Sequence, residues 1–274
     1  MKIYTNRTMR FCVAALVLIL CLQMPVFAWQ FYDGSDIAAL EPGYALLEPD
    51  NWNREDLYAM RQKGITTLAW LNLSQIEENR LIPLDIKDKD YVISGRYLPE
   101  GKKLAVFYSQ SFRDLLRLRL REYLLKGFAG VVFAKVGYYD KLSNSPINRS
   151  EMWRLVTDLA VEARRLSSSA LVVVHDASCF FDEIRQTPII SGVVEEGLYF
   201  GKQGRQVRAW DREKRLNTLI KLKENDKLIL LAEDARTEKR RQFSSSESQK
   251  HGFDSAFAQL PMIIERKVTD GSKK

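Results

Sequence analysis

Cysteine and histidine are scarce in this chain of 274 residues, which holds three cysteines and two histidines. Cys12 and Cys21 lie in an apolar N-terminal segment, so Cys179 is alone in the rest of the chain. This excludes an internal disulfide and a cysteine-based metal site there. His175 and His251 are far from any HxxH spacing, so we expect no metal site and no cofactor. Cys179 precedes two phenylalanines, and we interpret it as a buried apolar residue.

A long hydrophobic run is also missing. The apolar segment Phe11–Leu20 follows a positively charged start but is too short to span a bilayer. Residues 26–28 fit a small-residue cleavage site, so the pattern predicts a signal peptide over residues 1–28. We therefore expect a secreted or periplasmic protein without a stable membrane span in the mature chain. An uncleaved signal anchor, or a lipoprotein at Cys21, is the alternative.

The chain has neither a strong charge imbalance nor a nucleotide-binding glycine motif. The formal net charge is +7, and Lys2, Arg7 and Arg10 of the leader contribute three of the positive charges. Such a mild excess does not favour a nucleic-acid partner. No GxGxxG follows an apolar run, which removes the usual dinucleotide-binding interpretation.

What is present is an alternation of short apolar runs with helical patterns. We expect strands at residues 44–47, 65–73, 104–108, 131–133, 171–174, 192–194, 228–231 and 252–253, and helices at 54–63, 112–126, 150–165 and 212–223. Apolar strands between helices are typical of parallel sheets buried on both faces. The pattern predicts an α/β fold, a single-domain (β/α)8 TIM barrel over residues 29–268, with a doubly wound open sheet as the alternative. We expect a mobile loop at residues 239–250 and a disordered tail at 269–274.

Acidic and aromatic residues gather at the ends of the expected strands, where barrels of this kind carry their sites. The acids are Glu48, Asp50, Glu77, Asp176, Glu195, Glu196, Glu233 and Asp234. The aromatic residues are Trp70, Tyr138, Tyr139 and Tyr199. Carboxyl groups transfer protons and flat rings stack on sugar faces, so this combination is typical of a carbohydrate cleft.

Several segments, taken in order, resemble the endo-α-1,4-polygalactosaminidase-like glycoside hydrolases, the family 114 type of TIM barrel. The resembling segments are Tyr32-Asp33-Gly34, residues 46–50 (LLEPD), 64–73 (GITTLAWLNL), 127–131 (GFAGV), 191–196 (SGVVEE) and 252–253 (GF). The resemblance implies a carbohydrate-active TIM barrel whose partner is an amino-sugar exopolysaccharide.

The resemblance also implies site residues, position by position. The family's acidic pair comes from the fourth and sixth strand ends. Its strand-six Glu falls on Glu196, whereas its two strand-four Asp positions fall on Ala134 and Gly137. Glu77 matches an acid that follows the family's second strand. Asp176, on the neighbouring strand end, could supply the missing acid.

Two functions therefore stay open. In a hydrolase, Glu196 would be general acid or nucleophile, with Asp176 or Glu77 as its partner. In a binding or scaffolding pseudoenzyme, the same barrel would engage the polymer without cleaving it. The alternative for residues 175–176 is structural: Asp176 caps the next helix while His175 packs on Phe180. The candidate substrate-binding residues are Tyr32, Asp50, Trp70, Tyr138, Tyr139 and Tyr199.

Overall fold

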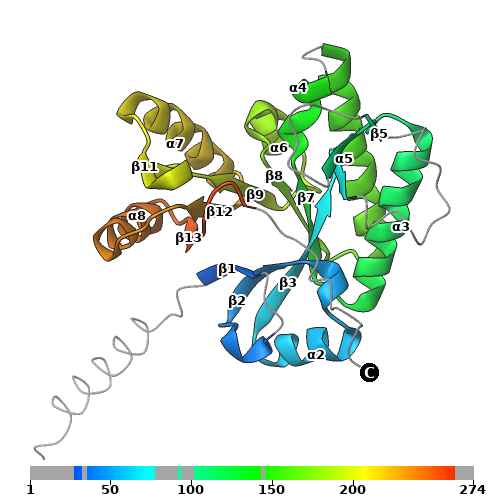
Figure 1. Cartoon of the computed structure of the whole chain (residues 1–274), viewed down its shortest axis with the longest axis horizontal. Coiled ribbons are helices and arrows are strands. Elements are labelled where there is room, and N and C mark those ends of the chain that lie inside the picture. Colours follow the sequence, from blue (N-terminus) through cyan, green and yellow to red (C-terminus); the bar gives the residue numbers. More distant parts are fainter. Residues whose placement is uncertain (1–27, 33–35, 78–91, 94–101, 143–145, 263–274) are drawn as a thin grey trace, which may run out of the picture.

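The computed structural model describes residues 28–32, 36–77, 92–93, 102–142 and 146–262. Eight parallel strands form one sheet, in the order β1-β2-β3-β7-β8-β9-β12-β13 (Figure 1). They are β1 (Ala28–Tyr32), β2 (Gly43–Leu47), β3 (Ile65–Asn72), β7 (Gly130–Ala134), β8 (Leu171–His175), β9 (Gly192–Glu196), β12 (Leu228–Glu233) and β13 (Asp254–Phe257). The last strand lies against the first, so the sheet curls into a nearly closed barrel. This confirms the (β/α)8 prediction and excludes an open sheet.

A helix follows each barrel strand from β2 to β12 and packs on the outside of the sheet (Figure 1). These helices are α2 (Arg54–Gln62), α3 (Gln110–Lys126), α5 (Pro146–Leu166), α6 (Phe181–Gln186), α7 (Ala209–Lys223) and α8 (Glu238–Lys250), with the short α4 (Tyr139–Leu142) before α5. Helix α2 begins at the predicted Asn53, which forms a capping box with Asp56.

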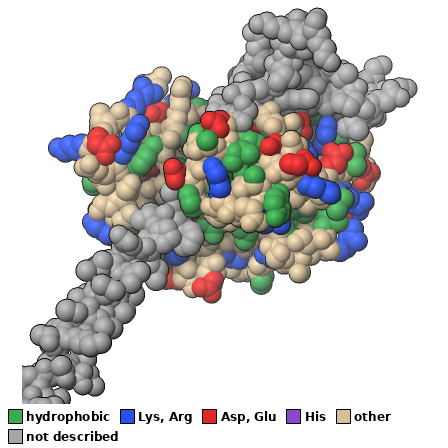
Figure 2. All heavy atoms as spheres, turned by 90° about the horizontal axis from the view of Figure 1, so that it is seen from below, with side chains coloured by type: hydrophobic (Ala, Val, Ile, Leu, Met, Phe, Trp, Pro, Cys, Tyr) green, Lys and Arg blue, Asp and Glu red, His purple; other side chains and the backbone are tan. Residues whose placement is uncertain are grey.

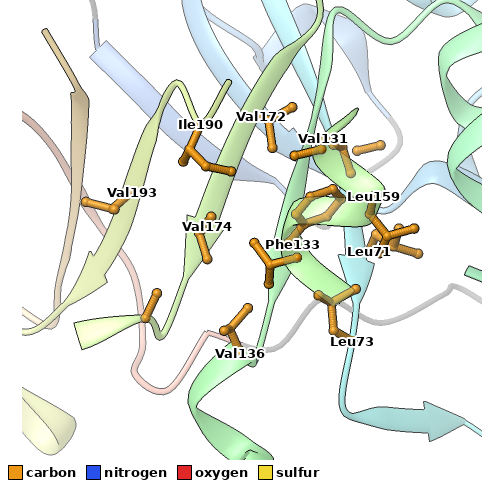
Figure 3. Close-up of a cluster of buried hydrophobic side chains, with 14 of the residues drawn as sticks. Leu71, Leu73, Val131, Phe133, Val136, Leu159, Val172, Val174, Ile190 and Val193 are labelled. Carbon is orange, nitrogen blue, oxygen red and sulfur yellow. The ribbon is translucent and has the colours of Figure 1, made fainter. Parts of the chain in front are cut away.

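Alternate residues of each strand separate two hydrophobic layers. On β7, Val132 and Ala134 belong to the barrel interior. Val131 and Phe133 face outward and join the layer that contains Leu159 of α5 (Figure 3). Because successive strand residues point to opposite sides, each strand residue next to the rim can be assigned to one layer.

Two strands begin with glycine because the neighbouring backbone leaves no room for a side chain. A Cβ at Gly130 would lie 2.3 Å from the carbonyl oxygen of Leu171, and one at Gly192 would lie 2.2 Å from that of Leu228. The glycine-apolar runs of the sequence thus mark close contacts between adjacent strands.

The prediction of a barrel strand at residues 104–108 was wrong. Residues Lys102–Ala105 form β6, which pairs antiparallel with β4 (Gln75–Glu77) and β5 (Val92–Ile93) in a separate small sheet. Ser109 then caps α3. The barrel's first strand is instead β1, which the sequence interpretation missed. The Trp29 indole N–H of β1 donates to the carbonyls of Leu231 and Asp254, which ties β1 to the other end of the sheet.

The C-terminal part also differs from expectation. Residues 239–250 are not a loop but most of α8, whose Thr237 side chain accepts the Arg240 N–H. The buried side of this helix includes Ser244 and Ser248, so it lacks the apolar periodicity that predicts a helix. The eighth strand begins two residues later than predicted, at Asp254.

The surface and the chain termini add four observations. Cys179 is exposed, so its prediction as a buried residue was wrong. Figure 2 shows acidic and basic side chains mixed over one face, with hydrophobic ones between them. In the part of the chain that the structure describes, no helix has the length and apolarity to cross a bilayer. The predicted leader, up to residue 27, and the predicted tail lie outside the described residues.

Candidate functional site

Three neighbouring strands bring their carboxyl ends together on one rim of the barrel. Strand β8 pairs with β7 on one side and with β9 on the other. The strands end at Ala134, His175 and Glu196. Since barrels of this kind carry their sites at these ends, this rim is the candidate site.

Glu195 and Glu196 lie on opposite sides of β9. Glu195 is buried on the outer side, where its Oε1 accepts hydrogen bonds from Arg215 Nε (3.0 Å) and Nη2 (2.6 Å). Burial raises the pKa of Glu195, and Arg215 opposes that rise. Arg215 also donates to the carbonyls of Glu196 and Gly197. Glu195 therefore anchors α7 to the strand end, and Glu196 is the acid of β9 that faces inward.

The Glu196 carboxylate is held through one oxygen. Its Oε1 lies 2.8 Å from Nε2 of His175, 3.0 Å from the backbone nitrogen of Met262 and 3.9 Å from Nζ of Lys135. No hydrogen bond from a described residue reaches Oε2. Burial raises the pKa of Glu196, but His175, Lys135 and the Met262 N–H together outweigh it and hold that pKa below its ordinary value. An ionised carboxylate at neutral pH suits a nucleophile or an electrostatic anchor, and does not suit a general acid.

His175 is fixed from two further directions. It is fully buried, and the Lys135 backbone N–H donates to its Nδ1 at 3.4 Å. With Nδ1 an acceptor, the ring places a proton on Nε2 and donates it to Glu196. The Trp70 ring lies 4.8 Å away, centroid to centroid, and limits the tilt of the imidazole. His175 therefore does not pack on Phe180; it orients Glu196.

Lys135 takes a left-handed backbone conformation, with φ of 61°, directly after β7. The Ser74 hydroxyl donates to its carbonyl at 2.8 Å, which supports this conformation. Its Nζ lies 5.4 Å from the centroid of the Tyr138 ring as well as near Glu196. The sequence interpretation missed Lys135 as a site residue, because a buried lysine inside an apolar run cannot be distinguished from a surface one.

Asp176 follows His175 in a left-handed conformation, with φ of 57°. Its carbonyl accepts the Gly137 N–H at 2.7 Å. The 3-10 helix after it has no side-chain cap, so the capping alternative for Asp176 is wrong. Among the described residues its carboxylate makes no hydrogen bond or ion pair. It lines the same cleft as Glu196, so a second acid is available to a ligand there.

The two positions that carry aspartate in the resembling family are structurally unlike each other here. Ala134 is fully buried in the barrel interior and neighbours His175 across the β7–β8 pair. A Cβ on Gly137 would lie 2.7 Å from the carbonyl oxygen of Asp176. Position 134 could therefore hold a carboxylate directed at the rim, whereas position 137 has no room for one.

The chain after β13 packs onto the barrel rim. Leu260 and Met262 are buried and belong to the same hydrophobic cluster as Trp70 and Ala134. The Met262 N–H is one of the three groups on Glu196. Sequence reasoning missed this segment because isolated apolar residues outside a helix or strand have no periodicity.

Two predicted site residues, Tyr32 and Asp50, make contacts other than with Glu196, and a third, Glu77, is described by its backbone alone. The backbone of Glu77 ends β4, where it pairs with Lys102, and its side chain is outside the described part. The Tyr32 hydroxyl donates to the Asp36 carbonyl at 2.9 Å. Asp50 lies in a 3-10 helix and donates its N–H to the Glu48 carboxylate.

Most of the predicted stacking rings are buried. Trp70, Tyr139 and Tyr199 are 3%, 7% and 2% exposed, so they present no free face to a sugar ring. Trp70 supports His175, and Tyr139 packs on Phe180. The Tyr199 hydroxyl is buried without a hydrogen-bond partner among the described residues. Tyr138, half-buried beside Lys135, is the predicted ring that remains at the rim.

A cleft of about 1010 Å³ opens outward from this rim. It is lined by the end of β8, by α6, by the end of β9 and by α7. Its lining includes His175, Asp176, Glu196, Trp210 and Asp211. Within the described residues, no group of three or more His, Cys, Asp or Glu side chains is arranged to hold a metal ion.

No protein-family model matches the sequence, and no curated protein matches it. Solved structures share its fold. The glycoside hydrolase domain of PelA from Pseudomonas aeruginosa matches with a TM-score of 0.69 and 15% identity, over 85% of this chain and 94% of that one. Aspergillus fumigatus Ega3, solved in complex with galactosamine, matches with a TM-score of 0.67 and 15% identity, over 86% and 92%.

An alpha-galactosidase from Thermus thermophilus matches with a TM-score of 0.50 and 10% identity, over 80% of this chain and 52% of that one. At these identities the likeness establishes the fold. The PelA and Ega3 structures are the kind of barrel that the sequence motifs resemble.

Proposed function

We propose that this chain, which has the barrel fold of those glycoside hydrolase domains, binds an amino-sugar polysaccharide at the rim around Glu196. We also propose that it is an extracytoplasmic protein. The leader pattern of residues 1–28 supports the location. The galactosamine bound to Ega3 and the sequence resemblance support the class of sugar.

The observation that carries this proposal is the state of Glu196. Its depressed pKa makes it a carboxylate at neutral pH, and its Oε2 accepts no hydrogen bond from the described residues. A free carboxylate oxygen at the mouth of a barrel is a partner for the ammonium group of an unacetylated amino sugar. Its other oxygen is already fixed by His175, so the free oxygen is held in place before a ligand arrives.

Binding without cleavage is the version that the geometry supports best. Hydrolysis of a glycosidic bond ordinarily uses two carboxyl groups, one of which donates a proton. Ala134 supplies a methyl group where the family has an acid, and the charge pattern around Glu196 keeps it from donating a proton. The barrel would then act as a recognition or scaffolding module on the polymer.

A hydrolase with a rebuilt site is the second candidate, and Asp176 favours it. This carboxylate lines the Glu196 cleft from the adjacent strand and has no partner among the described residues. With Glu196 as nucleophile or base and Asp176 as acid, the two-carboxylate requirement would be met from β8 and β9.

Binding and cleavage can be measured on the same purified mature protein. Calorimetry with a galactosamine oligosaccharide should show binding, and Glu196→Gln should weaken it at least about tenfold by removing the charge. Glu55→Gln, an exposed carboxylate on α2, is the matched control and should bind like the parent. An N-acetylated oligosaccharide should bind more weakly than the free amine.

Release of reducing ends separates the two candidates. No release by a protein that binds the oligosaccharide supports the recognition module. Release by the parent but not by Asp176→Asn would establish the hydrolase instead. Failure of the parent to bind any amino-sugar oligosaccharide would refute both.

A further inference from the structure

The cleft beyond Glu196 carries an aromatic side chain that the fold does not use. Trp210, in the first turn of α7, is 72% exposed and lines this cleft. Tryptophan contributes more apolar area than any other side chain, and leaving it in water forfeits the free energy of burial. One face of the ring is near a cation, because Lys214 Nζ lies 5.8 Å from its centroid.

Two carboxylates in the lining of this cleft have no partner among the described residues. Asp176 and Asp211 are half-buried, and neither makes a hydrogen bond or ion pair there. The other acids of the outer cleft are paired: Glu183 with Arg149, Glu195 with Arg215 and Asp182 with Arg185. The lining also holds more acidic than basic side chains, although the whole chain is basic. The cleft therefore offers acceptors to hydroxyl or ammonium groups and repels anions.

The size and course of the cleft fit a chain-like ligand. Its volume of about 1010 Å³ is at the upper end of the range for small-ligand pockets, and both Glu196 and Trp210 line it. The cleft has a flat ring, free carboxylates and a connection to the rim. These features suit a surface that binds further units of a sugar chain whose first unit lies at Glu196.

We propose that Trp210, with Asp211, forms an outer sugar-binding subsite that holds a pyranose farther along the chain than the one at Glu196. The inference rests on the function proposed above. The apolar face of the pyranose stacks on the indole, and its hydroxyl or amino groups donate to the Asp211 carboxylate. Affinity then grows with chain length until the chain reaches Trp210.

Chain length is the variable that tests this subsite. Calorimetry with a galactosamine disaccharide and hexasaccharide compares the parent with Trp210→Ala and Asp211→Asn. We expect Trp210→Ala to weaken the hexasaccharide about tenfold and to leave the disaccharide unchanged, since the shorter ligand does not reach the ring. The matched control is Tyr58→Ala, which removes a ring 63% exposed on α2 and should change neither affinity. Hexasaccharide should also shift the tryptophan fluorescence of the parent, and Trp210→Ala should abolish that shift.

The outcomes separate this subsite from the function on which it rests. If the parent binds both ligands and Glu196→Gln weakens both, but Trp210→Ala behaves like Tyr58→Ala, the subsite is refuted and the proposed function stands. Equal weakening of both ligands by Trp210→Ala also refutes it, because that loss belongs to the rim or to the fold. If the parent binds neither ligand, the proposed function fails and the subsite fails with it.

Discussion

His175 donates from Nε2 to Oε1 of Glu196 across 2.8 Å, between the ends of adjacent strands. The direction of this bond is set by the backbone N–H of Lys135, which occupies Nδ1. A fully buried imidazole ring thus fixes one oxygen of a half-buried carboxylate and leaves the other for a ligand. The pKa of Glu196 and its ability to bind a ligand should accordingly depend on His175 and Lys135.

Replacing His175 with alanine should raise the pKa of Glu196. Burial already favours the protonated form, and the variant loses the strongest of the groups that oppose it. Since a depressed pKa means that the carboxylate is retained down to low pH, the variant should lose amino-sugar binding at a higher pH than the parent. The measurement is a carbon-13 NMR titration of labelled glutamate, with His251→Ala as the control. An unchanged Glu196 titration in His175→Ala would show that the bond does not set this pKa.

Ala134→Asp should create glycosidase activity if the missing acid is what prevents cleavage. Position 134 faces the barrel interior beside His175, so a carboxylate there would be on the same rim as Glu196. A positioned acid or base typically contributes on the order of a hundredfold or more to rate. Reducing-end release should therefore exceed that of the parent by about that factor. A folded Ala134→Asp variant that binds the oligosaccharide but releases nothing would show that more than this acid has been lost.

Gly137→Asp should not restore activity and should destabilise the fold. Its Cβ would lie 2.7 Å from the Asp176 carbonyl oxygen, which also accepts the Gly137 N–H. The loop must shift to relieve this overlap, so we expect a loss of about 1–3 kcal/mol in urea unfolding. Parent-like stability would mean that the loop yields without cost. The contrast with Ala134→Asp matters because the sequence alone treats the two positions as equivalent.

The strands that could be predicted are those that consist of a continuous apolar run, because such a run indicates a buried strand. The runs 130–134, 171–175 and 228–233 are apolar because both faces of these strands are covered. The observed ends of each strand differ from the predicted ends by no more than two residues. Strand β1 was missed because its five residues (AWQFY) adjoin the leader pattern. Helix α8 was missed because its buried face is largely serine, so its helical conformation depends on tertiary contacts and a Thr237 cap.

The site was predictable only in part, for a reason of geometry. Strand ends could be recognised, and parallel pairing then placed Glu196 and Asp176 on the same rim. The sequence could not show that Glu195 faces away from it, that Lys135 turns back toward Glu196 or that Met262 caps it. It also could not distinguish Trp70, enclosed inside the barrel, from Trp210, exposed on the cleft. These features of the site depend on side-chain direction and on contacts between distant parts of the chain. No local sequence pattern encodes either of them.

The leader pattern predicts a mature N-terminus near Trp29. Expression of the full chain in a secretion-competent host should give an extracytoplasmic product whose N-terminal sequence starts at or within a few residues of that position. Ala28→Arg, which places a large charged residue at the cleavage site, should block processing. An uncleaved product from the parent chain would favour the signal anchor.

Glu233 should make the protein less stable as the pH rises toward neutrality. The carboxyl group is fully buried, and its oxygens accept the backbone N–H groups of Leu198, Tyr199 and Phe200. Burial nevertheless raises its pKa from 4.5 to about 7, with those N–H groups opposing the rise. A folded-state pKa above the unfolded value means that folding takes up a proton between the two. The stabilising contribution is therefore complete below about pH 4.5 and is lost up to about pH 7, a change of about 3 kcal/mol.

Glu233→Gln tests this assignment because glutamine cannot titrate. Free energies of unfolding in urea at pH 5 and pH 8 should show a smaller difference for the variant than for the parent, whereas Glu55→Gln should keep the parent's difference. Comparing the change with pH cancels the constant cost of placing an amide near the N–H donors. Parallel pH profiles for parent and Glu233→Gln would contradict the raised pKa.

The segment that Glu233 holds also leads to the cleft. The Tyr199 carbonyl accepts the Val207 N–H, and both Val207 and Trp210 line the wall of the cleft. Loss of the bonds between the Glu233 carboxyl group and the backbone N–H groups should therefore weaken hexasaccharide binding more than disaccharide binding, because the Trp210 end of the cleft depends on that segment.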